Sequence, residues 1–452
     1  MTDARAIMVR WLPWLLALAF LMLWQSPVIV AYDDHLTPSR LILEHRRLPA
    51  IDECWECHQP PLYYLAGAAA LALRRDSAGE ISASRAFAAL KTLALLFSLG
   101  SLALLAALTR RFFPDDPSAQ LVALAVAGLT PVFLLSVVML GNDSAVLFFA
   151  LLFCWLAAPG PRGGRLSRGR VALLGAVAGA AVLSKYNGFA LLPAGLGVVL
   201  WRGRHEGLPA RALWVRVAVA AAAFLALTGP WFARNMVATG SPIPTRMGQI
   251  ETIDSERYDL FSLHPLALLR TPFELRARIA PGATRPYLAH QVLTAADTSL
   301  WTKTYASWWS DAFYYLPQPA PGWTVARYLA ALPVCLMALA GVGLAAWALV
   351  RRPRARQRGV APVASRAGFV APVLLTVSLL GLYFAFVARY PWVRLGHGRA
   401  SFLLPLIVPF ALGVGLGYAA LARRCRAAAI IPVALLVALT AHYALFLGTY
   451  YF

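Results

Sequence analysis

The apolar stretch WLPWLLALAFLMLWQSPVIVA at residues 11–31, followed directly by YDDH at 32–35, decides the fold class. A helix of about 20 apolar residues crosses the roughly 30 Å hydrocarbon core of a bilayer. No A-x-A cleavage site follows the stretch, so we expect an uncleaved membrane helix with acidic groups and a histidine just beyond its end. Ionisable groups held close to a bilayer are costly and are usually functional.

The composition of the whole chain agrees with a membrane protein. Of 452 residues, 60% are hydrophobic and only 13% are charged, which is unlike a soluble domain. The net charge of +21 would suggest nucleic-acid binding in a soluble protein. Here the arginines occupy short loops between apolar runs, as the positive-inside rule requires, so nucleic acid is not an expected partner.

The apolar runs predict an all-α integral membrane protein with about eleven transmembrane helices. We expect one polytopic membrane domain over residues 1–452, with an outer loop at 32–83 and a larger outer loop at 231–322 that forms a small cap. The predicted spans lie at 11–31, 84–108, 119–140, 143–158, 170–184, 187–201, 213–230, 323–350, 368–388, 400–421 and 427–448.

The arginine-rich loops predict the orientation. They fall on one side, the cytoplasm, if the N-terminus is also inside. This scheme requires that the short apolar segment 60–73 does not fully cross, as in a re-entrant or juxtamembrane helix. The arginines in question are Arg110, Arg111, Arg162, Arg165, Arg168, Arg170, Arg202, Arg204, Arg211, Arg216, Arg351, Arg352, Arg354, Arg356, Arg358, Arg423, Arg424 and Arg426.

The first outer loop carries the strongest chemical signal. Asp33 and Asp34 follow the first span closely and predict a general base or a metal ligand at the membrane surface. Solvated loop acids are the alternative. Glu56 and His58 lie in the same loop, ahead of a Pro60-Pro61 helix start, which favours a functional site.

Residues 54–58 spell Cys-Trp-Glu-Cys-His, the C-x-x-C-H pattern of covalent haem attachment. No distal ligand module surrounds this short pattern. A disulfide between Cys54 and Cys57 on the oxidising side of the membrane is a second interpretation, and two unpaired thiols are a third.

Further charged groups fall at predicted outer turns. Asp143 is either a second carboxylate facing the first loop or a turn and helix cap. Lys185, Arg234 and Arg399 are cations where the positive-inside rule expects none, so they are candidates for binding a lipid phosphate, with snorkelling anchors as the alternative. The aromatic segment 302–315 predicts either an interfacial belt or a groove for sugar rings and isoprenoid chains.

In this order, the motifs resemble those of the polytopic GT-C glycosyltransferases, in particular the bacterial dolichyl-phosphate-mannose protein mannosyltransferase-like group and the lipid A aminoarabinose transferases. Two departures are Asp-Asp in place of Asp-Glu and Ala400 in place of an aromatic residue. The stretches that carry the resemblance are Asp33-Asp34, His58-Gln59-Pro60-Pro61-Leu62-Tyr63-Tyr64, Asp143, Lys185-Tyr186-Asn187-Gly188, Pro230 to Asn235, and Gly398-Arg399.

The resemblance implies an inverting transfer of a hexosyl or pentosyl group from a polyprenyl-phosphate donor to a protein, lipid or glycan acceptor. It implies a multi-pass protein of the bacterial inner membrane with its site on the outer face. The expected catalytic residues are Asp33, Asp34 and Asp143, and the expected substrate-binding residues are Glu56, His58, Gln59, Tyr63, Lys185, Tyr186, Arg234 and Arg399.

No cofactor is required for this chemistry, and a divalent ion held by Asp33 and His58 is left open. A lipid or glycan transporter is the rival hypothesis from another class. Such a protein needs broken helices and charges near mid-membrane. The notable charges here lie at the outer ends of helices, which favours an enzyme.

Overall fold

The computed structural model describes residues 4–27, 29, 33–77, 79–159, 165–245, 257–278, 298–310, 320–350, 363–393 and 399–449. These residues form helices and loops. The β-type pairing among them is limited to two isolated bridges, Arg257 with Trp392 and Asp259 with Ser299. The helices are α1 Ala4–Gln25, α2 Leu36–His45, α3 Leu62–Ala72, α4 Ala83–Phe112, α5 Pro117–Gly128, α6 Pro131–Ser136, α7 Asp143–Ala157, α8 Arg168–Ser184, η1 Tyr186–Ala190, α9 Leu191–His205, α10 Ala210–Thr239, α11 Pro265–Arg278, α13 Leu300–Trp309, α14 Pro321–Val350, α15 Val363–Arg389, η4 Ala400–Leu406, α16 Ile407–Ala422 and α17 Arg426–Thr449.

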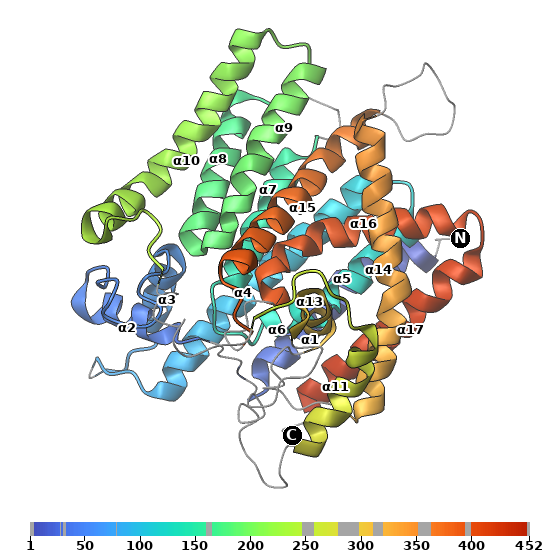
Figure 1. Ribbon diagram of the computed structural model, residues 1–452, viewed down its shortest axis with the longest axis horizontal. Coiled ribbons are helices and arrows are strands. Elements are labelled where there is room, and N and C mark those ends of the chain that lie inside the picture. The colour runs from blue at the N-terminus through green and yellow to red at the C-terminus, as the bar shows by residue number, and fades with distance from the viewer. Residues whose placement is uncertain are drawn as a thin grey trace.

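The prediction of an all-α polytopic membrane protein is confirmed (Figure 1). Within the described ranges, seven segments are long and apolar enough to cross a membrane, so the count of eleven is not confirmed. They are Ala4–Gln25, Ala83–Phe112, Ala210–Thr239, Pro321–Val350, Ala367–Arg389, Ala400–Ala422 and Arg426–Thr449.

The run predicted as one span at 119–140 is broken in the structure. It forms α5 and α6, separated by Leu129 and Thr130, and the backbone of Thr130 is extended with ψ 126°. Pro131 explains the break, because proline disfavours helical geometry at the preceding residue and has no N–H to donate. The apolar pattern predicts one helix here, whereas the structure has two short helices.

The end of the first helix also differs from the prediction. α1 stops at Gln25 rather than near residue 31, and Asp33 lies outside the helices, shortly before α2 begins at Leu36. Pro27 cannot donate a hydrogen bond to the carbonyl of Leu23, and the Ser26 hydroxyl donates to that carbonyl instead, at 2.6 Å.

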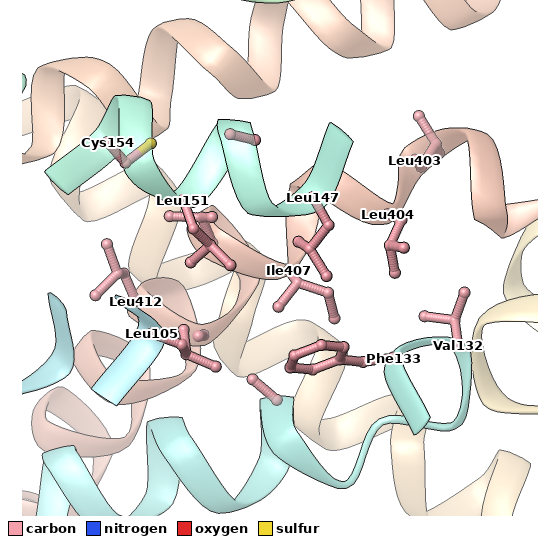
Figure 2. Packing of buried hydrophobic residues seen from close by; sticks show 14 of the residues in the cluster. Leu105, Val132, Phe133, Leu147, Leu151, Cys154, Leu403, Leu404, Ile407 and Leu412 are labelled. Carbon is pink, nitrogen blue, oxygen red and sulfur yellow. The ribbon is translucent and has the colours of Figure 1, made fainter. Parts of the chain in front are cut away.

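The core is built around α7 and α16. In Figure 2, Leu147 and Leu151 of α7 face Ile407 and Leu412 of α16, with Phe133 closing the layer below. All five are buried. α7 begins at Asp143 and η4 begins next to Arg399, so the packing of this core fixes the distance between these two charged residues.

Small residues allow two helix pairs to approach closely. A Cβ atom on Gly341 of α14 would overlap the carbonyl of Gly413 in α16, and one on Gly175 of α8 would overlap that of Ala220 in α10. Close backbone contact of this kind is how helices associate in lipid, where apolar burial between helices gives little driving force.

The loop predicted at residues 32–83 contains two short helices. α2 and α3 pack on each other and on α4 (Figure 1). At 11 residues, α3 spans about 16 Å, which is too short to cross the bilayer core. That length supports the prediction that segment 60–73 does not fully cross.

Candidate active site

A cavity of about 390 Å³ lies where the segment of Asp33 to Gln59, η1, α15 and η4 meet. One end of it is polar and the other is apolar. The residues that line it are Asp33, His35, Trp55, Glu56, His58, Gln59, Lys185, Tyr186, Asn187, Phe189, Ile243, Thr245, Leu379, Leu382, Tyr383, Phe386, Tyr390, Arg399 and Phe402. Seven of the residues expected from the sequence are therefore brought together from four separate segments of the chain: Asp33, Glu56, His58, Gln59, Lys185, Tyr186 and Arg399.

Asp33 and Arg399 form an ion pair at the polar end of the cavity. A terminal nitrogen of Arg399 lies 2.8 Å from Oδ2 of Asp33, although 366 positions separate them. Burial is the largest influence and raises the pKa of the Asp33 carboxyl, but Arg399, His35 and Lys185 together lower it by more, so that the pKa falls to about 2. Asp33 is therefore ionised throughout the physiological range.

Lys185 and Asp143 form a second, more deeply buried ion pair. The Lys185 ammonium donates to both carboxylate oxygens of Asp143, at 2.8 and 2.9 Å. Only Lys185 lines the cavity, and Asp143 supports it from behind, at the start of α7. The aromatic ring of Phe402 lies 4.9 Å from the Lys185 ammonium and 5.2 Å from the Arg399 guanidinium, so one ring holds both cations.

The turn after α8 aims Lys185 at this position. α8 ends at Ser184, and Lys185 is extended, which releases its side chain from the helix. A Cβ atom on Gly188 would collide with the backbone of Ala181 in α8. Only glycine therefore fits where η1 packs back against α8. Asn187 then donates to the carbonyl of Phe402 at 3.0 Å and ties η1 to η4.

A disulfide joins Cys54 and Cys57, with Cα atoms 5.1 Å apart. This state of the two sulfurs matches the second of the three interpretations and leaves neither free to attach haem. The disulfide closes a tight turn that presents Glu56 to the cavity, and the His58 Nδ1 donates to the Trp55 carbonyl at 2.9 Å. The loop is therefore held rigid next to Asp33.

Glu56 and Asp33 are two carboxyls with opposite pKa shifts. Burial, and next the negative charge of Asp33, raise the pKa of Glu56 to about 8. Glu56 is thus protonated at neutral pH and can donate a hydrogen bond, while Asp33 remains an acceptor. Pairs of carboxyls whose pKa values are shifted in opposite directions are common in active sites.

We expect this shift to make the protein less stable at alkaline pH. The pKa of Glu56 is raised above its ordinary value of 4.5, so its contribution is fully present below pH 4.5 and is lost as pH rises through about 8. Melting temperatures in detergent, measured from pH 5 to 9, should fall for the wild type relative to Glu56→Gln, mostly between pH 5 and 8. Parallel pH profiles for the two proteins would contradict the shift.

Four of the residues expected at the site do not line the cavity. Asp143 acts through Lys185, as above. Asp34 is exposed and accepts from the Thr37 backbone and hydroxyl at 3.1 and 2.5 Å, as an acid at a helix start does. Tyr63 is buried in a small aromatic cluster with Tyr64. Arg234 lies inside α10, which continues past Pro230, where it donates to the carbonyl of Pro49 and stacks on Trp231.

The aromatic segment predicted as a belt or groove does neither within the described residues 302–309. It forms α13, whose Trp308 and Trp309 pack edge-on against Phe410 in the core. Residues 313–315 lie outside the described residues, as do His397 and Gly398. α13 instead supports the site, because the Ser307 hydroxyl accepts from the backbone N–H of Ala400 at 2.7 Å.

Two features of the site were not assigned from the sequence: His35, which was noted in YDDH but given no role, and the apolar wall. His35 lines the cavity beside Asp33, with its Nδ1 2.8 Å from the Tyr64 hydroxyl, and burial lowers its pKa to about 4, so it is neutral. Its place next to two acids in YDDH was the available signal. The apolar wall from α15, including Leu379, Leu382 and Phe386, gave no signal, because apolar residues in an apolar helix look alike.

The divalent ion that the sequence left open at Asp33 and His58 stays a prediction, and the described residues add no further ligand to it. Among the described residues, no group of three or more His, Cys, Asp and Glu side chains could hold an ion. In addition, Asp33, one of the two expected ligands, already faces the cationic Arg399. We therefore derive no chemical step through a metal.

Comparisons with known proteins agree with this fold. Residues 78–231 match the family model of dolichyl-phosphate-mannose-protein mannosyltransferase. The chain is 16% identical to the oligosaccharyltransferase of Archaeoglobus fulgidus, solved with a tethered acceptor peptide, and the match covers 97% of this chain and 54% of that one with a TM-score of 0.53. The chain is 17% identical to ArnT from Cupriavidus metallidurans bound to undecaprenyl phosphate. That match covers 98% of this chain and 78% of that one, with a TM-score of 0.38.

No curated protein matches the chain. The chain spans about half the length of the oligosaccharyltransferase structure that it matches. At these identities the likeness concerns the fold alone, and it confirms the resemblance to the GT-C membrane proteins that the motifs indicated.

Proposed function

We propose that this chain, which has the fold of the GT-C membrane glycosyltransferases, transfers a sugar from a polyprenyl-phosphate donor to an acceptor. One observation carries the proposal. The cavity joins a polar end, where Asp33 faces Arg399 and Lys185, to an apolar wall from α15. An amphipathic cavity of this kind fits a ligand with an anionic head, a sugar and a hydrocarbon tail. The family match of residues 78–231 supports the same chemistry.

In the proposed reaction Asp33 is the general base. It takes the proton of the acceptor nucleophile, which attacks the anomeric carbon of the donor sugar while the bond from that carbon to the phosphate oxygen breaks. The electron pair leaves with the phosphate, and Arg399 and Lys185 stabilise its charge. A single displacement of this type inverts the anomeric configuration. Protonated Glu56 and His58 line the same cavity and are proposed to bind the sugar.

We place the site on the outer face of a bacterial inner membrane, with the N-terminus in the cytoplasm. The arginine-rich loops support this orientation. The disulfide between Cys54 and Cys57, beside the cavity, supports it independently, because disulfides persist on the oxidising side of the membrane.

The proposal is tested with purified protein in liposomes. Radiolabelled polyprenyl-phosphate sugars, supplied one at a time with membrane extracts as acceptor, should release polyprenyl phosphate only when the protein is present. Mass spectrometry of the labelled product would then identify the acceptor, which can be a protein, a lipid or a glycan. Transport of intact donor across the bilayer without cleavage of the sugar–phosphate bond would overturn the proposal in favour of a flippase.

Arg399→Ala should weaken donor binding by about 1.5–3 kcal/mol, the range for hydrogen bonds to charged groups. Arg399→Lys should restore only part of the affinity, because an ammonium cannot form the planar two-pronged contact of a guanidinium with phosphate. Equilibrium binding of a polyprenyl-phosphate sugar in nanodiscs measures both effects.

Two other arginines serve as controls for this experiment. Arg234 was expected at the phosphate site but lies outside the cavity, on the carbonyl of Pro49. Arg424 is exposed after α16. Arg234→Ala and Arg424→Ala should each change donor affinity by less than about 0.5 kcal/mol. Equal losses at all three arginines would indicate a general charge effect and contradict a phosphate site at Arg399.

A further inference from the structure

The charges around the cavity cancel. The cations among its described lining residues are Lys185 and Arg399, and each faces one carboxylate, Asp143 and Asp33. Glu56 and His35 are neutral at physiological pH. A phosphate group entering this polar end therefore meets no uncompensated positive charge, which is a poor starting point for binding an anion.

The two ion pairs differ in how readily they can open. The pair of Lys185 and Asp143 makes two hydrogen bonds, and its side chains are only 9% and 6% exposed. The pair of Arg399 and Asp33 has one bond of 2.8 Å, and the Asp33 side chain is 30% exposed. A carboxylate that can be rehydrated loses less on separation than one sealed in the interior. The Asp33 pair is thus the one that an entering anion can displace.

We propose that the donor phosphate binds by taking Arg399 from Asp33, so that donor binding itself exposes the catalytic base. This inference rests on the proposed function and adds an order to it, with donor before acceptor. In the free protein Arg399 holds the Asp33 carboxylate as a weak base. Once the guanidinium turns to the phosphate, the carboxylate regains its proton affinity next to the bound sugar. When the product phosphate leaves, the ion pair re-forms.

Both partners can make this exchange without a large movement of the backbone. Arg399 lies just before η4 with its guanidinium over the ring of Phe402, so the exchange asks only for a change in the side chain of Arg399. Asp33 sits in the connection between α1 and α2, where no helix fixes its side chain. The neighbouring Phe402 backbone stays tied to Asn187 in η1.

The exchange makes an unusual prediction, because loss of the base should tighten donor binding. We expect Asp33→Asn to bind undecaprenyl phosphate about tenfold more tightly than the wild type, since Arg399 no longer has to leave a carboxylate. Equilibrium binding in nanodiscs at fixed salt measures this, with undecaprenol as the probe that lacks phosphate. Asp34→Asn is the matched control and should keep wild-type affinity, because Asp34 lies outside the cavity.

A double-mutant cycle separates exchange from simple repulsion between Asp33 and phosphate. In an Arg399→Ala background, Asp33→Asn should no longer tighten binding if the gain comes through Arg399. If the gain persists in that background, repulsion explains it and the exchange is overturned. Unchanged or weaker binding by Asp33→Asn alone also overturns it.

A measurement on the wild type does not depend on how a neutral variant folds. Adding undecaprenyl phosphate should shift a carboxylate stretching band in the infrared difference spectrum, and Asp33→Glu should move that band. A spectrum without such a band contradicts the exchange. If the wild type binds undecaprenyl phosphate no better than undecaprenol, the proposed function itself fails, whereas phosphate-dependent binding without these effects removes only the exchange.

Discussion

Asp33→Asn should lower the turnover of sugar transfer by about 10² or more, while the protein stays folded. Asparagine keeps the shape of the side chain and its contact with Arg399 but cannot accept the proton of the acceptor. The side chain lines the cavity and is partly exposed, so the substitution leaves no void in the core. Single-turnover release of polyprenyl phosphate from a labelled donor measures the loss without a contribution from product release.

Asp34→Asn is the matched control for this prediction. The two residues are adjacent, but Asp34 is exposed and bonds to Thr37 at the start of α2, outside the cavity. Its substitution should leave turnover within about a factor of two, since exposed changes of this kind cost within about 0.5 kcal/mol. If Asp33→Asn turned over donor normally and Asp34→Asn did not, the assignment of the base would be wrong.

The largest expected effect on stability comes from the pair of Lys185 and Asp143. Replacing Asp143 by Asn leaves a buried ammonium facing a neutral group, which costs about 3–5 kcal/mol when a buried ion pair is broken from one side. The side chains are 9% and 6% exposed, so water cannot compensate for the lost partner. The free energy of unfolding in detergent micelles, from denaturant titration, should fall by that amount.

Removing both charges should cost much less than removing one. The double variant Asp143→Asn, Lys185→Met leaves no unpaired charge, so we expect it to be more stable than Asp143→Asn alone. The exposed pair of Arg40 and Glu44, at 48% and 46% exposure, is the comparison, and Glu44→Gln should change stability by less than about 1 kcal/mol. Similar losses at the two pairs would mean that Lys185 is not buried in the folded protein.

Much of the membrane fold could be predicted from local patterns. The runs near 84–108, 213–230 and 427–448 each became one long helix, because a helix is the only open-chain structure that satisfies its own backbone in lipid. The errors occurred where proline acts on the backbone. Pro27 ended α1 early, and Pro131 divided the run at 119–140 into two helices. Hydropathy counts side chains and does not register a missing N–H.

The sequence alone determined that this is an all-α polytopic membrane protein with acids and cations near the ends of its predicted helices, because composition and residue order decide both. Only the tertiary structure decided which of them meet. Asp33 pairs with Arg399 across 366 positions, Lys185 with Asp143 across 42, and Arg234 is held outside the cavity. It also decided their protonation, since Asp33 and Glu56 are both carboxyls and shift in opposite directions. The physical reason is that the energy of a charge depends on its distance to other charges in space and on its burial. The order of residues along the chain specifies neither directly.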